Sequence, residues 1–158
     1  MGRELTFWTI RAATLCYALA VFARLRRRES VTAGRIPWTA GCVLYLVHVA
    51  LAFHFFHNWS HADAVRETAR RTQEMFGIAD GSGVYWNYLF TAVWTIDVFW
   101  WWTSARKYPN WLKYAIHGFM AFMFLNAVIV FGSPGMRWLG AVVLAALLVY
   151  IVKRLRSR

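Results

Sequence analysis

The sequence predicts an all-α integral membrane protein, a bundle of about five transmembrane helices with a short amphipathic helix on its outer surface. Three observations predict this class. The chain of 158 residues is 59% hydrophobic, whereas a soluble domain of this size is apolar over about half of its residues. The apolar residues collect in five runs, and the basic residues stand in short clusters between those runs. Lipid is therefore the expected solvent for most of the chain.

Each apolar run is expected to cross roughly 30 Å of hydrocarbon at about 1.5 Å per residue. The last run is short, so its flanking aromatic and basic residues must complete the crossing. The chain has no internal repeat and no low-complexity linker, and we expect residues 1–158 to form a single transmembrane helical domain. The five runs cover residues 5–22, 38–56, 84–102, 111–131 and 138–152.

The segment between the second and third runs predicts the outer-surface helix, over residues 60–76. Ser60 followed by Asp63 is a typical helix-capping pair, and apolar residues recur after it at a helical period until glycine residues interrupt the pattern. The alternative is a solvated lid in which oppositely charged side chains pair with one another. Those side chains are Arg66, Arg70 and Arg71 on one side and Glu67 and Glu74 on the other.

The distribution of Lys and Arg predicts the orientation, because basic residues near membrane ends are retained in the cytoplasm. One side of the predicted bundle carries Arg24, Arg26, Arg27, Arg28, Arg35, Arg106, Lys107, Lys113, Lys153, Arg154, Arg156 and Arg158. The other side carries only Arg3, Arg66, Arg70, Arg71 and Arg137. The N-terminus is therefore expected outside and the C-terminus in the cytoplasm, in a membrane such as the bacterial inner membrane.

The net charge of +11 does not indicate a nucleic-acid partner, because the basic residues do not follow one polar face. The expected surroundings are the lipid bilayer and either further copies of this chain or a partner in a membrane complex. Tryptophans near the run ends, including Trp38 and the Trp100–Trp102 triplet, are expected in the headgroup layer, which suits an amphipathic ring.

Three histidines at the outer end of the second run form a candidate metal site. On a continuous helix, His54, His57 and His61 fall within an arc of about 60°. Neutral imidazoles that converge in this way bind zinc, copper or iron. The alternative is that they bond to headgroups and water at the interface. A helix break at Asn58–Ser60 would change the geometry.

A second set of polar residues lies within the predicted spans. Asp97 and His117 are both expected roughly 9 Å deep, on adjacent antiparallel helices. Together with His48, they are candidate cofactor-binding residues, and a b-type haem held by His48 and His117 is one candidate ligand. The alternative is a hydrogen bond or ion pair between Asp97 and His117 that only locks two helices together.

These residues lead to three hypotheses of function. In the first, the histidine-rich outer and intramembrane site binds a transition metal (Zn, Cu or Fe) or haem b for redox chemistry or metal handling. In the second, the same residues line a proton or small-solute path through an oligomer. In the third, the chain is a non-catalytic subunit of a larger membrane complex. The sequence contains no HExxH, GxSxG or phosphate-loop motif, and it assigns no catalytic residue.

Overall fold

The computed structural model describes residues 2–26, 31–104 and 109–156. These residues form helices and no strand, which confirms the all-helical class. Contacts divide the chain into two compact units, residues 1–116 and 117–158, and each unit is described by itself. Five basic residues used to predict the orientation, namely Arg27, Arg28, Arg106, Lys107 and Arg158, lie outside the described residues.

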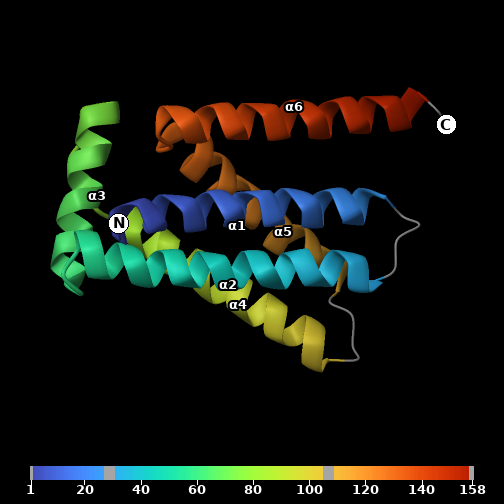
Figure 1. Ribbon diagram of the computed structural model, residues 1–158, viewed down its shortest axis with the longest axis horizontal. Coiled ribbons are helices and arrows are strands. Elements are labelled where there is room, and N and C mark those ends of the chain that lie inside the picture. The colour runs from blue at the N-terminus through green and yellow to red at the C-terminus, as the bar shows by residue number, and fades with distance from the viewer. Residues whose placement is uncertain (1, 27–30, 105–108, 157–158) are drawn as a thin grey trace. The chain divides into compact units, whose positions relative to one another are not determined.

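The first unit is built on two long helices, α1 (Gly2–Leu25) and α2 (Val31–Phe56), which lie side by side and antiparallel (Figure 1). Small side chains let them approach closely, as small residues do between membrane helices. Ala13 and Ala20 are buried. A β-carbon added to Gly41 of α2 would lie 3.2 Å from the β-carbon of Cys16 in α1.

Helix α2 ends in a sharp turn. Asn58 and Trp59 both adopt left-handed backbone conformations, with φ of 48° and 58°. The amide of Trp59 donates to the Phe53 carbonyl and that of Ser60 to the His57 carbonyl. These bonds satisfy carbonyls that the end of the helix would otherwise leave unpaired.

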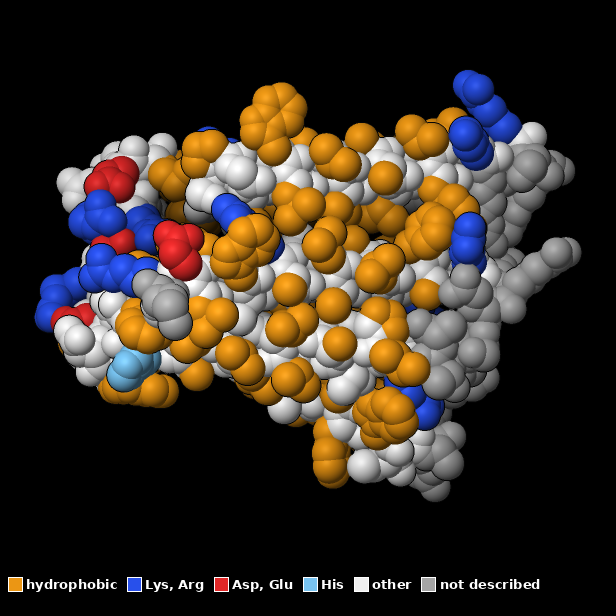
Figure 2. All heavy atoms as spheres, viewed as in Figure 1, with side chains coloured by type: hydrophobic (Ala, Val, Ile, Leu, Met, Phe, Trp, Pro, Cys, Tyr) orange, Lys and Arg blue, Asp and Glu red, His pale blue; other side chains and the backbone are white. Residues whose placement is uncertain are grey.

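Helix α3 (His61–Phe76) follows this turn and crosses the ends of α1 and α2 (Figure 1). The Ser60 hydroxyl accepts a hydrogen bond from the Asp63 amide, as the capping pair predicts. Gly77, with φ of 75°, ends the helix in the left-handed conformation that glycine adopts without a side-chain clash. Figure 2 shows charged side chains on α3, whereas hydrophobic side chains cover α1 and α2.

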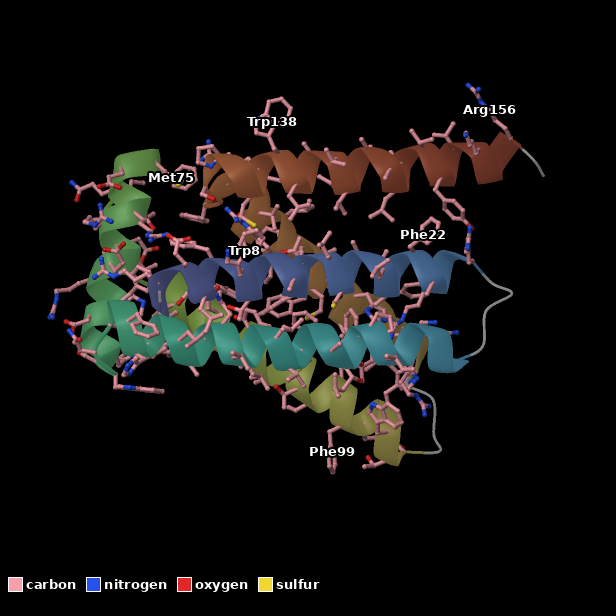
Figure 3. All side chains as sticks on the ribbon, viewed as in Figure 1. Trp8, Phe22, Met75, Phe99, Trp138 and Arg156 are labelled. Carbon is pink, nitrogen blue, oxygen red and sulfur yellow. The ribbon has the colours of Figure 1, made fainter. Side chains whose placement is uncertain are left out.

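Helix α4 (Gly83–Thr103) packs against α2 and α3. Its buried residues are Val84, Phe90, Trp94 and Asp97, of which the last three are spaced for one helical face. Phe99 lies on another face of α4, where 69% of it is exposed, and it points away from α1 and α2 (Figure 3). This helix brings Asp97 and the tryptophan triplet to the two long helices.

The second unit contains the end of α5 (Asn110–Leu125), a π-helical segment η1 (Asn126–Val130) and α6 (Pro134–Arg156). Helix α6 packs against η1. The Arg137 guanidinium donates to the carbonyls of Gly132 and Val130, and so satisfies acceptors in the turn between them. Trp138 is 75% exposed and points away from α6 (Figure 3).

A helix occupies each of the six segments where the sequence predicts one. Three helices in the described residues are long and apolar enough to span a membrane: Gly2–Arg24, Gly34–Phe56 and Asn110–Val130. Helix α4, which contains several Trp and Tyr residues and one Asp, is not among these three. The apolar part of α6 is the shorter stretch Pro134–Tyr150. The structure thus supports a membrane protein and leaves the number of spans as a prediction.

Candidate functional site

Asp97 is a buried carboxylate of α4, with 5% of the residue exposed. The indole Nε1 of Trp38, in α2, donates a 2.8 Å hydrogen bond to Asp97 Oδ2. The guanidinium of Arg24, at the end of α1, attracts the same carboxylate. A carboxylate within a membrane helix is costly unless a donor or an opposite charge compensates it. Asp97 therefore joins α4 to both long helices of its unit.

The predicted pairing of Asp97 with His117 stays a prediction. Asp97 belongs to the first compact unit and His117 begins the second. The sequence argument compared depths along two consecutive runs only, so it missed Trp38 and Arg24 as partners. Their positions are the signal for this contact. Arg24 follows the end of the first apolar run, Trp38 begins the second, and α4 packs back toward these ends.

A cluster of aromatic rings surrounds the Asp97 contact. Trp38 is 1% exposed and Trp94 is fully buried, and their ring centroids lie 5.4 Å apart. Tyr17, Tyr45 and Phe90 pack edge-on or stacked against Trp94. The Trp38 ring thus fills the space between helices and its N–H group binds Asp97, and its expected position in the headgroup layer stays a prediction.

His48 links α2 to α1. Its Nδ1 lies 2.9 Å from the carbonyl oxygen of Thr6. A carbonyl oxygen only accepts hydrogen bonds, so Nδ1 carries the proton and Nε2 keeps its lone pair. This tautomer suits two roles. It is a hydrogen-bonded link between two helices, and it is also the orientation in which a second hydrogen bond prepares an imidazole to ligate a metal.

The outer histidines do not share a helix face. The i, i+3, i+7 geometry requires one continuous helix, but α2 ends at Phe56 and α3 begins at His61. The indole of Trp59 donates to His54 Nδ1 at 3.3 Å. His57, just after the end of α2, packs on Phe53 of that helix at 5.5 Å between ring centroids.

His61 contacts two tyrosines of α4 instead of the other histidines. Its Nδ1 lies 2.8 Å from the Tyr88 hydroxyl, and its Nε2 lies 3.4 Å from the Tyr85 hydroxyl. Both ring nitrogens are thus engaged by α4. Within residues 2–26, 31–104 and 109–156, no group of three or more His, Cys, Asp or Glu side chains is placed to hold a metal ion. Metal binding by His54, His57 and His61 stays a prediction that this geometry does not support.

The charged side chains of α3 pair with one another, as the alternative interpretation of this segment predicts. Arg70 and Arg71 both bond to Glu67, with nitrogen–oxygen distances of 2.8 Å. The pKa of Glu67 is lowered to about 2, mainly by the hydrogen bond from Arg70 and further by the one from Arg71. Arg66 pairs with Asp63, and Arg70 also pairs with Glu74.

His57 lies beside this charged helix. Its Nδ1 is buried and has no hydrogen-bond partner among the described residues. Burial lowers the pKa of His57, and the charge of Arg71 adds to this effect, while Glu67 and Asp63 act in the opposite direction. The imidazole is therefore held in its neutral form more strongly than a histidine in water.

An arginine–tryptophan cluster, consisting of Arg24, Arg35, Trp101 and Trp102, lies at the opposite end of the unit from α3. Arg24 Cζ lies 4.3 Å from the centre of the Trp101 ring. Arg35 Cζ lies 5.6 Å from the same ring and 5.1 Å from that of Trp102. The sequence argument used these arginines only to predict orientation. The signal that it missed is the tryptophan triplet, which an antiparallel α4 brings next to both arginines.

Comparison with protein-family models, with curated proteins and with solved structures found no match to this chain. The function must therefore be argued from the site geometry.

Proposed function

We propose that this chain is a structural helical subunit of a larger membrane complex, in which intramembrane polar groups hold its own helices together. One observation carries the proposal: two of the polar side chains that suggested a chemical site, Asp97 and His48, are bonded to neighbouring helices. Asp97 of α4 accepts from Trp38 of α2, and His48 of α2 bonds to the Thr6 carbonyl of α1. Hydrogen bonds between membrane helices contribute about 0.6 kcal/mol each on average, and up to about 1.7 kcal/mol.

Two substitutions of His48 separate a structural link from a ligand. In His48→Asn, the amide nitrogen replaces Nδ1 as donor to Thr6, but the Nε2 lone pair is lost. In His48→Leu, both are lost. A structural role predicts that His48→Leu lowers the unfolding temperature in detergent and that His48→Asn retains most of it.

The complex itself is tested by gentle extraction from native membranes, followed by measurement of the particle mass. A subunit is expected in a particle with a constant ratio of this chain to its partner. Recovery as a lone chain, or proton or solute flux in liposomes that depends on Asp97, would contradict a purely structural role.

A second candidate function is favoured by the His48 tautomer, which leaves Nε2 able to bind iron or another metal. In this function the chain holds haem b or a transition metal for redox chemistry or metal handling. Of the residues expected to bind the metal or haem, His48 has a suitable ligating atom in Nε2, whereas the three outer histidines do not converge. The group would supply electron transfer when bound, and Thr6 would orient the ligating ring.

The same two variants test this candidate. If His48 is a ligand, the wild-type protein purifies with metal or with a haem absorption spectrum, and His48→Asn and His48→Leu lose it equally. Wild-type protein that folds without either group would contradict the candidate.

We also infer the finer topology: five spans in a bacterial inner membrane, with the N-terminus outside and the C-terminus in the cytoplasm. The end of the first unit that holds Arg24, Arg26 and Arg35 is rich in basic residues, whereas α3 at the other end balances its charges internally. Basic residues favour the cytoplasmic side. Besides the three apolar helices, α4 and α6 would also cross, as the third and fifth crossings along the chain.

A further inference from the structure

Within the arginine–tryptophan cluster, Arg35 has no counter-ion among the residues that the structure describes. The Asp97 carboxylate attracts the Arg24 guanidinium and accepts a hydrogen bond from the Trp38 indole. Arg35 forms no salt bridge and no side-chain hydrogen bond with the described residues. Its Nε is buried and lacks a partner. Within the described part of the chain, this guanidinium therefore has no anionic partner.

The tryptophans hold Arg35 in place without using its donors. Arg35 lies over the faces of Trp101 and Trp102, and such contacts bind the cation through the ring face. The Trp102 indole donates a 2.9 Å hydrogen bond to the Thr39 hydroxyl, one turn further along α2. This bond holds Trp102 on α2, the helix that carries Arg35, so the ring is fixed beside the guanidinium.

The position of the cluster identifies the source of the anion. Arg24 lies near the C-terminal end of α1 (Gly2–Leu25), and Arg35 lies near the N-terminal end of α2 (Val31–Phe56), two helices apolar enough to span a membrane. Arg24 and Arg35 therefore lie where the hydrocarbon core gives way to headgroups, the layer in which tryptophan also concentrates. Gly34 lies between them, with its nearest neighbours being the Arg24 side chain and the Trp101 ring.

We propose that this cluster binds the phosphate of an anionic phospholipid, with Arg35 as its main ligand. The planar guanidinium offers paired N–H donors that match two phosphate oxygens. The lipid charge supplies the counter-ion that Arg35 lacks, while Asp97 serves Arg24. Arg35, the main ligand, takes part in none of the hydrogen bonds that carry the structural role, so either proposal can fail without the other.

Binding is tested with purified full-length protein in nanodiscs of phosphatidylcholine, to which phosphatidylglycerol is added, with bound lipids counted by native mass spectrometry. Arg35→Gln is expected to weaken phosphatidylglycerol binding about tenfold, the loss that follows from removing a charge-assisted hydrogen-bond pair. Lys113→Gln is the matched control, because it removes the same charge but contacts none of these rings. An equal loss in both variants would overturn the proposal.

Two further measurements test the proposal even if Arg35→Gln does not fold. Arg35→Lys keeps the charge but not the paired donors and is expected to bind less tightly than the wild type; unchanged binding would overturn the proposal. In wild-type protein, a phosphatidylglycerol carrying a photoreactive headgroup is expected to label the segments around Arg35 and Trp101. Labelling confined to other segments would contradict the assignment.

Inorganic phosphate separates the lipid from a soluble ligand. Added to the nanodiscs, free phosphate is expected to displace little phosphatidylglycerol, because the lipid chains anchor the headgroup beside the cluster. Displacement at phosphate concentrations comparable to those of the lipid would show that a soluble phosphate compound is the ligand and would overturn the lipid assignment.

Discussion

At the scale of single residues, two polar side chains, Asp97 and His48, link helices. Asp97 is the clearest case, because it meets a donor from α2 and a cation from α1 at once. Removing one partner of such a group leaves the others unpaired in a medium that solvates them poorly. The cost then comes from the groups left behind, and not only from the bond that is lost.

Asp97 variants measure this cost. Asp97→Asn keeps an acceptor for the Trp38 indole but removes the charge, and we expect it to lower the free energy of unfolding by about 1–2 kcal/mol. Asp97→Ala leaves both Trp38 and Arg24 without this partner, and we expect a loss of about 3–5 kcal/mol. Chemical unfolding in detergent, followed by circular dichroism, checks both values. Equal stability of the two variants would show that the Trp38 bond contributes nothing.

His57 should make stability depend on pH. Its pKa is lowered by burial from an unfolded value near 6.5, so the unfolded chain binds a proton more readily than the folded one. The stabilisation is complete above the unfolded pKa and is lost as the pH falls through the lower, folded pKa. The wild type is therefore expected to lose stability relative to His57→Leu as the pH falls below about 6.5. A difference that stays constant across this range would refute the role of His57.

At the scale of elements, local signals determine where helices begin and end, and packing determines how they bend. Ser60 and Gly77 bound α3 by capping. The π-helical segment η1 has no comparable local signal, and it lies where α6 packs closely. Gly140 of α6 is buried against Val128 of η1. Such segments are tolerated where a neighbouring element makes contact with the widened turn.

Two glycines of the second unit test this contact. A β-carbon at Gly140 would overlap the Val128 side chain, which is β-branched and stiff, so Gly140→Ala is expected to destabilise the protein by about 1–3 kcal/mol. A β-carbon at Gly118 would meet nothing within 4 Å. Gly118→Ala is therefore expected to stabilise helix α5 by about 0.5–1 kcal/mol. Thermal unfolding in detergent distinguishes the signs, and a shared sign would contradict the packing argument.

At the scale of the whole molecule, the open question is how many helices cross the membrane. Three meet the criteria of length and apolarity, and five are expected from the runs. The two possibilities agree on the side of the C-terminus if the N-terminus is outside. They differ on the turn between η1 and α6, which lies outside with five spans and inside with three.

Cysteine labelling at that turn decides between them. In a chain carrying Cys16→Ala and Cys42→Ala, Ser133→Cys is expected to react with a membrane-impermeant maleimide added to intact cells, as is Gln73→Cys of α3. Lys153→Cys is expected to react only after the membrane is opened. Reaction of Ser133→Cys from the inside alone would favour three spans.

Periodicity and composition were enough to predict most of the helical fold. Each apolar run became a helix, and the Ser60–Asp63 cap was correct, because both depend on neighbours within a few residues. The candidate site was predicted less well. The histidine face failed because two left-handed residues, Asn58 and Trp59, end α2, and an Asn–Trp pair is not a strong sequence signal for such a turn.

The sequence alone determined the solvent of this chain, because an apolar excess in helix-length runs indicates lipid. The free energy of transferring such a run from water depends on its composition and not on how the helices pack against one another. Only the tertiary structure decided which polar groups meet. Trp38 and Asp97 are far apart along the chain, and Arg35 meets Trp101 and Trp102 only because α4 returns along α2. Hydrogen bonds and ion contacts act over a few ångströms, so their partners follow from how the helices pack.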